Sequence, residues 1–344
     1  MERIPDLSAL GRLLDWCAGR GASDLHLRAG YEARVRIHGR LDRVPGEVCP
    51  PLDDARMTAW LRESFSPELN ARLAERLEHD TSFQHRDLRY RANFSRQRGR
   101  LSCSLRVVPT QAVGFEELQL PDSLPELVRE PRGLVLLTGP TGEGKSTTAR
   151  ALLQHLNRTQ ALRIVTVEDP IEYVFADEQS CFEQREVGID TGAFADGIRN
   201  AMRQDPDVIF VGEIRDRESI WAAMQAAETG HLVITTLHAD SAAQAIGRLR
   251  EFYPADEQPG LSALLSRNLN ALLCQRLLPN RQGTRTPCLE ILRRDAGVQQ
   301  AIRENQLQLL TGIIEASTHV GMHTFDQYLQ ELLVAGIIDE PTAR

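Results

Sequence analysis

Long hydrophobic runs are missing from this sequence of 344 residues. Its uninterrupted apolar stretches are short, as at 134–137 and 208–211. A helix that crosses a bilayer needs about 20 such residues, so we expect no transmembrane segment. Residues 1–6 also lack the basic head and apolar stretch of a secretory signal. These absences favour a cytoplasmic protein.

Paired cysteines and an excess of basic charge are missing as well. The six cysteines are scattered, without any C-x-x-C pair, which excludes a four-cysteine zinc site and gives no disulfide framework. The formal net charge is −8 at pH 7. Bulk binding of nucleic acid is therefore not expected, although a local basic surface remains possible.

Lysine is almost absent. Of the 40 basic residues, 39 are arginines and one, Lys145, is a lysine. An ammonium is a compact point charge on a flexible stem, whereas a guanidinium is a broad planar fork. A single lysine among so many arginines indicates a position where arginine will not serve.

Residues 1–109 combine helical and strand patterns, which predicts a small α+β domain. We expect helices at 7–17 and 52–78, a turn near His38, and strands near 24–27, 33–37, 89–95 and 101–108. Residues 1–110 carry 19 arginines and 15 acidic residues, and the remainder carries 21 basic and 33 acidic residues. This asymmetry indicates that the two parts face each other, or face phosphate, across an interface.

After a predicted linker at 110–118, short apolar runs alternate with helical patterns. The expected strands are 134–137, 164–167, 208–211 and 232–235, with helices between them such as 194–203 and 217–229. Such a pattern predicts a parallel sheet covered on both faces, an α/β core over 119–266. Only 289–292 keeps a strand pattern afterwards, so we expect 267–344 to be mostly helical.

A complete phosphate-loop motif, G-x-x-x-x-G-K-[ST], stands between a predicted strand and a predicted helix. It consists of Gly139, Pro140, Thr141, Gly142, Glu143, Gly144, Lys145 and Ser146, and Thr147 follows it. Backbone N–H groups of such a loop surround phosphates, and the helix N-terminus adds positive potential. Lys145 would neutralise the terminal phosphates and the Ser146 hydroxyl would ligate Mg²⁺, which predicts ATP and Mg²⁺ as cofactors.

Glu143 places a carboxylate inside a loop that binds anions. We expect its side chain to point to solvent or to an arginine. The alternative is a weakened affinity for nucleotide.

Acidic residues follow two of the predicted strands. Glu213 comes after 208–211, where it could hold Mg²⁺ through water or polarise the attacking water. Glu168, Asp169 and Glu172 follow 164–167, and carboxylates near a nucleotide suit general-base and metal roles. The alternatives are a solvated strand end and a solvated acidic turn.

Histidines and arginines complete the set of candidate residues. His231 and His238 flank 232–235 and lie too far apart to share a metal, so each is either a phosphate sensor or subunit contact, or a cap. Arg89 and Arg91 face one side of a strand, with Arg106 on a later strand. They form either a solvated surface or a cluster that reaches a nucleotide across a domain boundary, as arginine fingers do.

Together these segments resemble the secretion ATPases of type II secretion and type IV pili, most closely the pilus retraction (twitching motility) ATPases. The resemblance covers nearly the whole chain. The matching runs are 22–27, 89–94, the phosphate loop, the acidic box 168–172, Gln-Arg-Glu-Val-Gly at 184–188, 203–207, the histidine box 229–238, and 321–327.

The resemblance implies a PAS-like N-terminal domain, a RecA-like ATPase domain with a helical C-terminal region, and a homohexameric ring. It implies Glu172 as general base and Glu213 as the Walker B acid. Arg89, Arg91 and Arg106 would approach the nucleotide from the N-terminal domain, while His231 and His238 would couple nucleotide state to domain movement. The implied partners are an inner-membrane pilus platform protein and, as a further candidate, a paralogous ATPase. The protein would be cytoplasmic and peripheral to that membrane.

The function implied is a Mg²⁺-dependent ATP hydrolase that powers pilus retraction. The absence of a tetracysteine module favours the retraction type. Against it, Gln299 stands where the retraction signature at 297–304 has its first arginine. An accessory retraction paralogue and a conjugation or type IV secretion ATPase are therefore alternatives. The acidic net charge argues against a RecA-like nucleic-acid motor. The intact nucleotide-binding motifs argue against a non-hydrolysing subunit.

Overall fold

The computed structural model describes residues 2–3, 8–37, 39–75, 77–108, 114–340 and 342. The chain divides into two compact units, Met1–Gln111 and Ala112–Arg344. Several expected features fall partly outside the described residues, namely residue 7 of the first helix, the turn at His38, and 110–113 of the linker.

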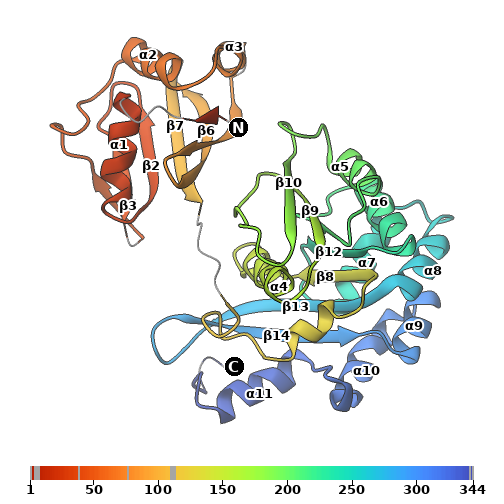
Figure 1. Cartoon of the computed structure of the whole chain (residues 1–344). Helices are drawn as coiled ribbons and strands as arrows, with labels where there is room; N and C mark the ends of the chain where they lie inside the picture. The colour runs from red at the N-terminus through yellow and green to blue at the C-terminus, as the bar shows by residue number, and fades with distance from the viewer. Residues whose placement is uncertain are drawn as a thin grey trace. The chain divides into compact units, whose positions relative to one another are not determined.

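The first unit is built on a seven-stranded sheet in the order β1-β5-β6-β7-β2-β3-β4 (Figure 1). Its strands are β1 (Glu2–Arg3), β2 (Ala22–Arg28), β3 (Arg34–Ile37), β4 (Arg40–Arg43), β5 (His79–His85), β6 (Leu88–Gln97) and β7 (Arg100–Val108). Neighbouring strands are antiparallel except β1 and β5. Alternate residues of β6, including Tyr90, Ala92 and Phe94, are buried, as a half-buried strand requires.

Three helices accompany this sheet: α1 (Ala9–Ala18), α2 (Asp54–Ser64) and α3 (Pro67–Glu75). The Ser8 hydroxyl caps α1 by accepting from the Gly11 N–H at 2.9 Å. The prediction of one helix over 52–78 is wrong. Phe65 is extended at the end of α2. Pro67 disfavours a helical conformation at the preceding residue, Ser66, so the helix cannot continue through this point.

The second unit contains another seven-stranded sheet, in the order β10-β9-β11-β12-β8-β13-β14. Its strands are β8 (Gly133–Thr138), β9 (Arg163–Glu168), β10 (Cys181–Glu186), β11 (Val208–Val211), β12 (Leu232–Leu237), β13 (Leu269–Pro279) and β14 (Arg285–Arg293). All neighbours are parallel except the β13–β14 pair at one edge.

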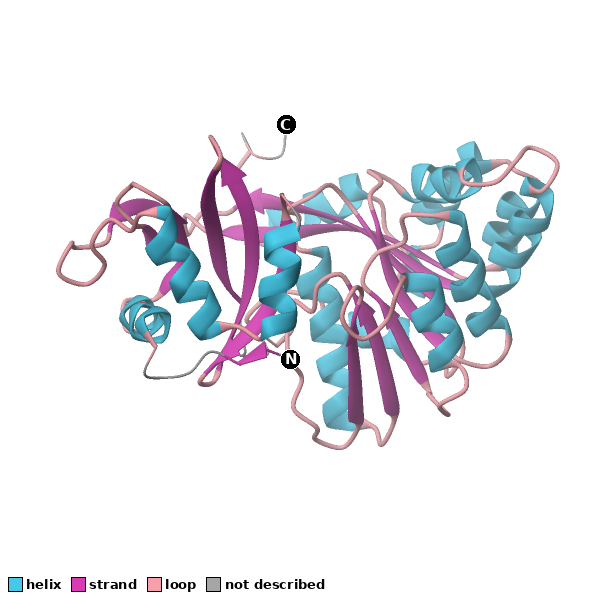
Figure 2. Cartoon of the chain, turned by 90° about the horizontal axis from the view of Figure 1, so that it is seen from above, coloured by secondary structure: helices cyan, strands magenta, loops and turns pink. Residues whose placement is uncertain are grey.

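Helices cover both faces of this sheet (Figure 2). The helical segments are η1 (Leu124–Val128), α4 (Lys145–Thr159), α5 (Phe194–Ala201), α6 (Arg217–Glu228), α7 (Ala242–Glu251), α8 (Gln258–Asn268), α9 (Ala296–Arg303), η2 (Leu307–Leu309), α10 (Leu310–Ala316), η3 (Thr318–Val320) and α11 (Phe325–Val334). Leu134 and Leu136 of β8 pack with α5 to α10, whereas Val135 and Leu137 pack with η1, α4 and α11. This confirms the predicted α/β fold.

The expectation of a mostly helical region after 266 is wrong for its first part. β13 and β14 form a long hairpin that completes the sheet. Leu269 to Gln275 are buried throughout, so this strand lacks the alternation that distinguishes a half-buried strand from a helix. The polar edge strand β10 was also not expected. Among the described residues, no helix has the length and apolar character needed to span a bilayer.

Candidate functional site

Four parallel strands of the second unit end at one edge of the sheet. β8 leads there into the phosphate loop, β12 into His238, β11 into Glu213, and β9 into the acidic turn that carries Glu172. Thr138 pairs with Leu237, and Val211 pairs with Val167. Ligands of open α/β sheets bind at this carboxyl edge.

The phosphate loop depends on its glycines. Gly139, Gly142 and Gly144 have φ values of 147°, 86° and 82°, in the region that side-chain-bearing residues rarely adopt. A Cβ added to Gly139 would lie 2.3 Å from the carbonyl oxygen of Gln275. The loop therefore packs directly against the backbone of β13.

Lys145 lies in the concave side of this loop and is 7% exposed. Its Nζ donates to the carbonyl oxygens of Gly139 at 2.7 Å and Pro140 at 2.8 Å, and it lies 3.1 Å from Nδ1 of His238. Burial lowers the pKa of Lys145, although the negative charges of Glu213 and Glu143 oppose the shift. The ammonium is thus held where phosphate oxygens would replace the loop carbonyls as its partners.

A chain of contacts runs from Lys145 across the strand ends. Nε2 of His238 lies 3.1 Å from a Glu213 oxygen. Arg215 donates to Glu213 at 3.0 Å and to Asp169 at 3.3 Å. Nδ1 of His238 faces an ammonium, which can only donate, so Nδ1 accepts a hydrogen bond from Lys145. Nε2 then carries the ring hydrogen and donates it to Glu213. The structure therefore links the phosphate loop, the β11 acid and the acidic turn.

Glu143 does not point to solvent or to an arginine, so that prediction is wrong. Its carboxylate accepts the N–H of Leu277 on β13. β8 pairs with β13 only as far as Thr138 opposite Cys274, and β13 then continues beside the loop. The Glu143 side chain thus bonds to the strand backbone beyond the point where β8 ends.

Gln275 is a second tie between the loop and β13, and it was not found from the sequence. Its buried amide donates to the Glu143 carbonyl at 2.7 Å and accepts from the Thr148 hydroxyl at 2.7 Å. The available signal was an amide at the end of the apolar stretch 271–274. It carried no weight because that run was expected to be helical.

The acidic turn contains one buried carboxyl, that of Glu168, and two exposed carboxyls, those of Asp169 and Glu172. Glu168 is buried and accepts from the Thr166 hydroxyl at 2.7 Å and the Gln184 amide at 3.3 Å. Burial raises the pKa of Glu168 to about 7, although these hydrogen bonds oppose the shift. Glu172 is exposed between buried Ile171 and Tyr173, so its carboxylate is free to meet solvent or substrate.

Ser146 and Thr147 lie in the first turn of α4 and are half-buried. The Thr147 hydroxyl accepts from Arg150 at 3.1 Å. No group of three or more His, Cys, Asp or Glu suited to a metal ion occurs among the residues that the structure describes. A hydroxyl from Ser146 and a carboxylate from Glu213 nevertheless fit Mg²⁺, which takes few protein ligands and completes its shell with phosphate and water.

The structure does not bring His231 to this edge. It precedes β12 (six residues) and His238 follows that strand, and seven steps at roughly 3.3 Å per residue place the two histidines about 23 Å apart. Its Nδ1 lies 2.9 Å from the carbonyl oxygen of Ala226, near the end of α6.

The three candidate arginines lie in the first unit. Arg89 is buried and donates to the Ser82 hydroxyl at 2.7 Å. Arg91 is exposed and pairs in register with Arg106, whose Nε donates to Asp24 at 2.7 Å. Burial raises the pKa of Asp24, but hydrogen bonds from Arg106 and Ser23 outweigh it and hold the pKa below its usual value.

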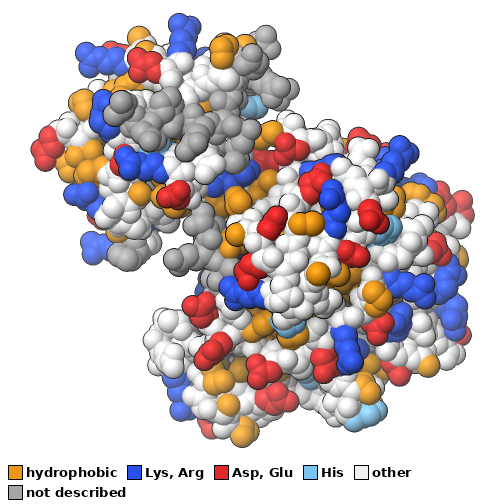
Figure 3. Space-filling view, in the orientation of Figure 1, with side chains coloured by type: hydrophobic (Ala, Val, Ile, Leu, Met, Phe, Trp, Pro, Cys, Tyr) orange, Lys and Arg blue, Asp and Glu red, His pale blue; other side chains and the backbone are white. Residues whose placement is uncertain are grey.

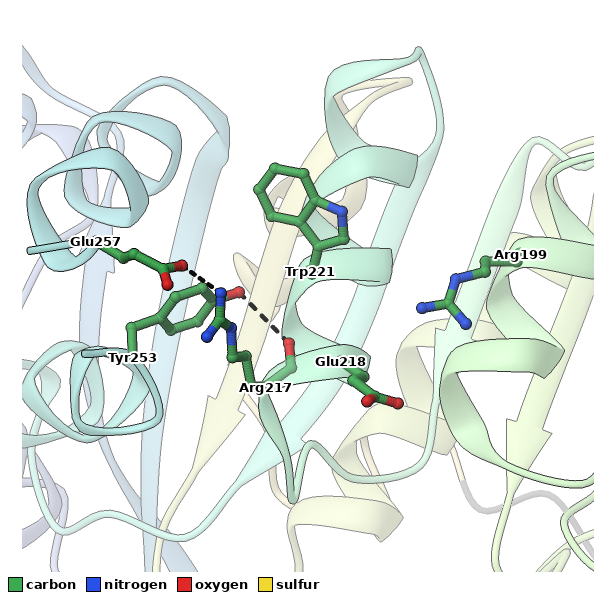
Figure 4. Close-up of a pocket in the computed structure, with 6 residues that line it drawn as sticks. All are labelled: Arg199, Arg217, Glu218, Trp221, Tyr253 and Glu257. Atoms are coloured by element: carbon green, nitrogen blue, oxygen red, sulfur yellow. Dashed lines mark hydrogen bonds and ion pairs between the residues drawn. The ribbon is translucent and has the colours of Figure 1, made fainter.

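A separate pocket of about 260 Å³ contains none of the predicted site residues. Figure 4 shows its lining residues, Arg199, Arg217, Glu218, Trp221, Tyr253 and Glu257. Its wall is fixed by an ion pair between Arg217 and Glu257, and the guanidinium of Arg217 lies 5.0 Å from the centre of the Tyr253 ring.

The surface of the second unit shows no concentration of one sign of charge on the face seen in Figure 3. Acidic and basic side chains are interspersed there. A nucleic-acid motor would bind backbone phosphates through a continuous basic surface, so this face does not favour that alternative.

A parallel sheet whose strand leads through a glycine loop into a helix headed by lysine defines a P-loop nucleotide-binding fold. The chain belongs to the family described as Type II/IV secretion system protein, whose model matches residues 12–317. The family resemblance inferred from the motifs is therefore confirmed.

Relatives and solved structures agree with this membership. The chain is 38% identical to the type IV pilus retraction ATPase PilT of Pseudomonas aeruginosa, over 96% of each chain. It is 36% identical to the type IV pilus ATPase PilU of that organism, over 95% of this chain and 85% of PilU.

The fold matches two crystal structures closely. The pilus retraction motor PilT with bound ADP superposes with a TM-score of 0.88 at 39% identity, covering 96% of this chain and 95% of that one. The ATPase DotB of Legionella pneumophila gives 0.85 at 27% identity, covering 100% and 98%.

Proposed function

We propose that this protein is a Mg²⁺-dependent ATPase that acts as a hexameric motor for type IV pilus retraction, and hence twitching motility. The observation that carries the proposal is the contact chain Lys145–His238–Glu213 at a complete phosphate loop. Similarity to PilT over nearly the whole of both chains supplies the process that the motor serves.

Binding of ATP would exchange the partners of Lys145. The loop carbonyls of Gly139 and Pro140, which now accept from its ammonium, would give way to phosphate oxygens. His238 would then report the phosphate through its bond to Glu213. Mg²⁺, held by Ser146 and Glu213, would neutralise charge on the phosphates.

The general base in this proposal is Glu172, with Glu213 as the alternative. Glu213 is bonded to His238 and Arg215, which suits a fixed acid beside the metal. Glu172 is exposed at the same sheet edge and is available to accept a proton from water.

Assembly would complete the site. We propose that Arg89, Arg91 and Arg106 stabilise the transition-state charge in a homohexamer. The motor would act on an inner-membrane platform protein from a cytoplasmic position at that membrane, with a paralogous ATPase as a further candidate partner. His231 lies at the other end of β12, so we do not expect it to contact the nucleotide bound by its own chain.

A second candidate is a motor of the same chemistry in a conjugation or type IV secretion system. One observation favours it: Gln299 stands where the retraction signature has its first arginine.

Gene deletion with complementation tests the proposal. We expect deletion to increase surface pili and abolish twitching, with recovery from the wild-type gene and none from Lys145→Ala. Cells without pili would instead indicate an assembly motor. Unchanged pili and twitching would contradict the retraction role.

A further inference from the structure

The segment that carries Glu172 lacks regular secondary structure. Residues 171–175 follow β9 and form neither helix nor strand. Ile171, Tyr173 and Phe175 are buried, whereas Glu172 and Val174 are exposed. Since buried backbone groups need hydrogen-bond partners, the contacts that hold this segment decide where the Glu172 carboxylate lies.

Gln184, at the centre of β10, supplies two of these contacts with one side chain. Its Nε2 donates to the Tyr173 carbonyl at 2.7 Å, and its Oε1 accepts the N–H of Phe175 at 2.8 Å. The same Nε2 lies 3.3 Å from an oxygen of Glu168. Only a primary amide offers a donor and an acceptor in this arrangement.

Glu186 supplies the contact on the other side of Glu172. It is 3% exposed, and its Oε2 accepts the N–H of Ile171 at 3.2 Å. Its own carbonyl accepts from the Asp190 N–H at 2.8 Å, and β10 pairs in parallel register with β9 as far as Glu168. The carboxylate thus comes from the end of a strand that is held by its pairing with β9 and by the turn at Asp190.

We propose that Gln184 and Glu186 of the Gln-Arg-Glu-Val-Gly motif are positioning residues for Glu172. They bond to the backbone at Ile171 on one side and at Tyr173 and Phe175 on the other, which leaves Glu172 between two fixed points. The inference rests on the proposed role of Glu172 as general base. The role assigned to this motif is separate from the contacts that hold the phosphate loop.

The physical reason is the precision that proton abstraction requires. A misplacement of about 1 Å can cost roughly 100-fold in rate. An exposed carboxylate on an irregular segment has no packing of its own to fix it. Side chains on a neighbouring strand hold the backbone instead, as supporting residues do for catalytic groups.

Gln184→Ala in the full-length protein tests the first contact. We expect kcat for ATP hydrolysis to fall about 10- to 100-fold, with KM and the Kd for a fluorescent ATP analogue within about twofold of wild type. Gln258→Ala is the matched control. Its amide also bonds a loop carbonyl, that of Tyr253 at 3.1 Å, away from the acidic turn, and we expect kcat to stay unchanged.

Glu186 is tested by loss and rescue. Glu186→Ala should lower kcat, whereas Glu186→Gln keeps an oxygen that accepts from Ile171 and should restore most of it. Equal loss in both variants would overturn the assignment for Glu186. Hydrogen exchange should show faster exchange at 171–175 in Gln184→Ala and Glu186→Ala while the rest of the sheet is unaffected. Unaltered exchange there would equally overturn the proposal.

Combination with Glu172→Gln separates this inference from the proposed function. If both hold, Glu172→Gln alone abolishes turnover with ATP binding retained, and adding Gln184→Ala changes kcat no further. If Glu172→Gln abolishes turnover but Gln184→Ala leaves kcat at the wild-type value, the positioning role is wrong and the base assignment stands. If Glu172→Gln hydrolyses ATP normally, the base assignment is wrong, and the positioning role that rests on it is wrong as well.

Discussion

Lys145 shows most directly how one side chain defines the site. Its ammonium bonds two loop carbonyls and contacts His238, and a broad guanidinium could not enter the same space. At this scale the sequence was informative. An isolated lysine in a complete loop motif, with acids at strand ends, predicted residues that the fold does bring together.

Replacement of Lys145 should therefore abolish hydrolysis even when the charge is kept. We expect both Lys145→Ala and Lys145→Arg to lower kcat at least about 100-fold, because a broad planar guanidinium does not fit the buried position that the compact ammonium takes. Phosphate release from ATP at saturating Mg²⁺ measures this. Substantial activity in Lys145→Arg would show that charge alone suffices.

Asp24 gives a prediction for pH. Its folded-state pKa lies below the ordinary value of 3.8, so its pairing with Arg106 stabilises the fold above that value and is lost as the pH falls through the folded-state pKa. We expect Asp24→Asn to cost about 1–2 kcal/mol near pH 7.

The loss of unfolding free energy caused by Asp24→Asn should shrink toward zero as the pH is lowered past 3.8. Urea unfolding of the first unit at several pH values measures it. The exposed Asp42→Asn on β4 is the control and should show little dependence on pH. A cost for Asp24→Asn that is constant with pH would contradict the ionic account.

Elements were predicted unevenly. Strands β8, β9, β11 and β12 were predicted from short apolar runs between helical patterns, and they carry the loop and the acids. β10 and β13 were not, because one is a polar edge strand and the other is buried on both faces. The contacts of Gln184 and Gln275 depend on which strands become neighbours, and no local pattern encodes that.

The packing of the loop on β13 predicts a sharp difference between two glycines. Gly139→Ala places a Cβ 2.3 Å from the Gln275 carbonyl, so we expect the loop to shift and the Kd for ATP to rise at least about tenfold. Gly283→Ala is the control, because Gly283 has a φ of 77° with nothing within 4 Å of its Cβ position. Its Kd should be unchanged. Equal effects would mean that backbone strain, not the clash, is responsible.

At the scale of the whole molecule, the phosphate loop and the candidate arginines belong to different units of the chain. If assembly completes the nucleotide site, as proposed, we expect turnover per subunit to rise with protein concentration as rings form. The monomer should have little activity of its own.

Arg91→Ala tests that arrangement, since Arg91 is exposed in the first unit. We expect kcat in the assembled ring to fall at least about tenfold, as for loss of an arginine finger, with nucleotide Kd little changed. Arg40→Ala, exposed on β4, is the control. An unchanged kcat for Arg91→Ala would place this arginine on an ordinary solvated surface.

The phosphate loop is fastened to the β13–β14 hairpin by Glu143 and Gln275. Tyr328 and Leu332 of α11 pack in the same core cluster as Leu289 and Ile291 of β14. Because of these contacts, a displacement of the phosphate loop would not stay within the loop itself. A shift of the loop when a phosphate binds would therefore be transmitted to the hairpin and to α11, which packs against it.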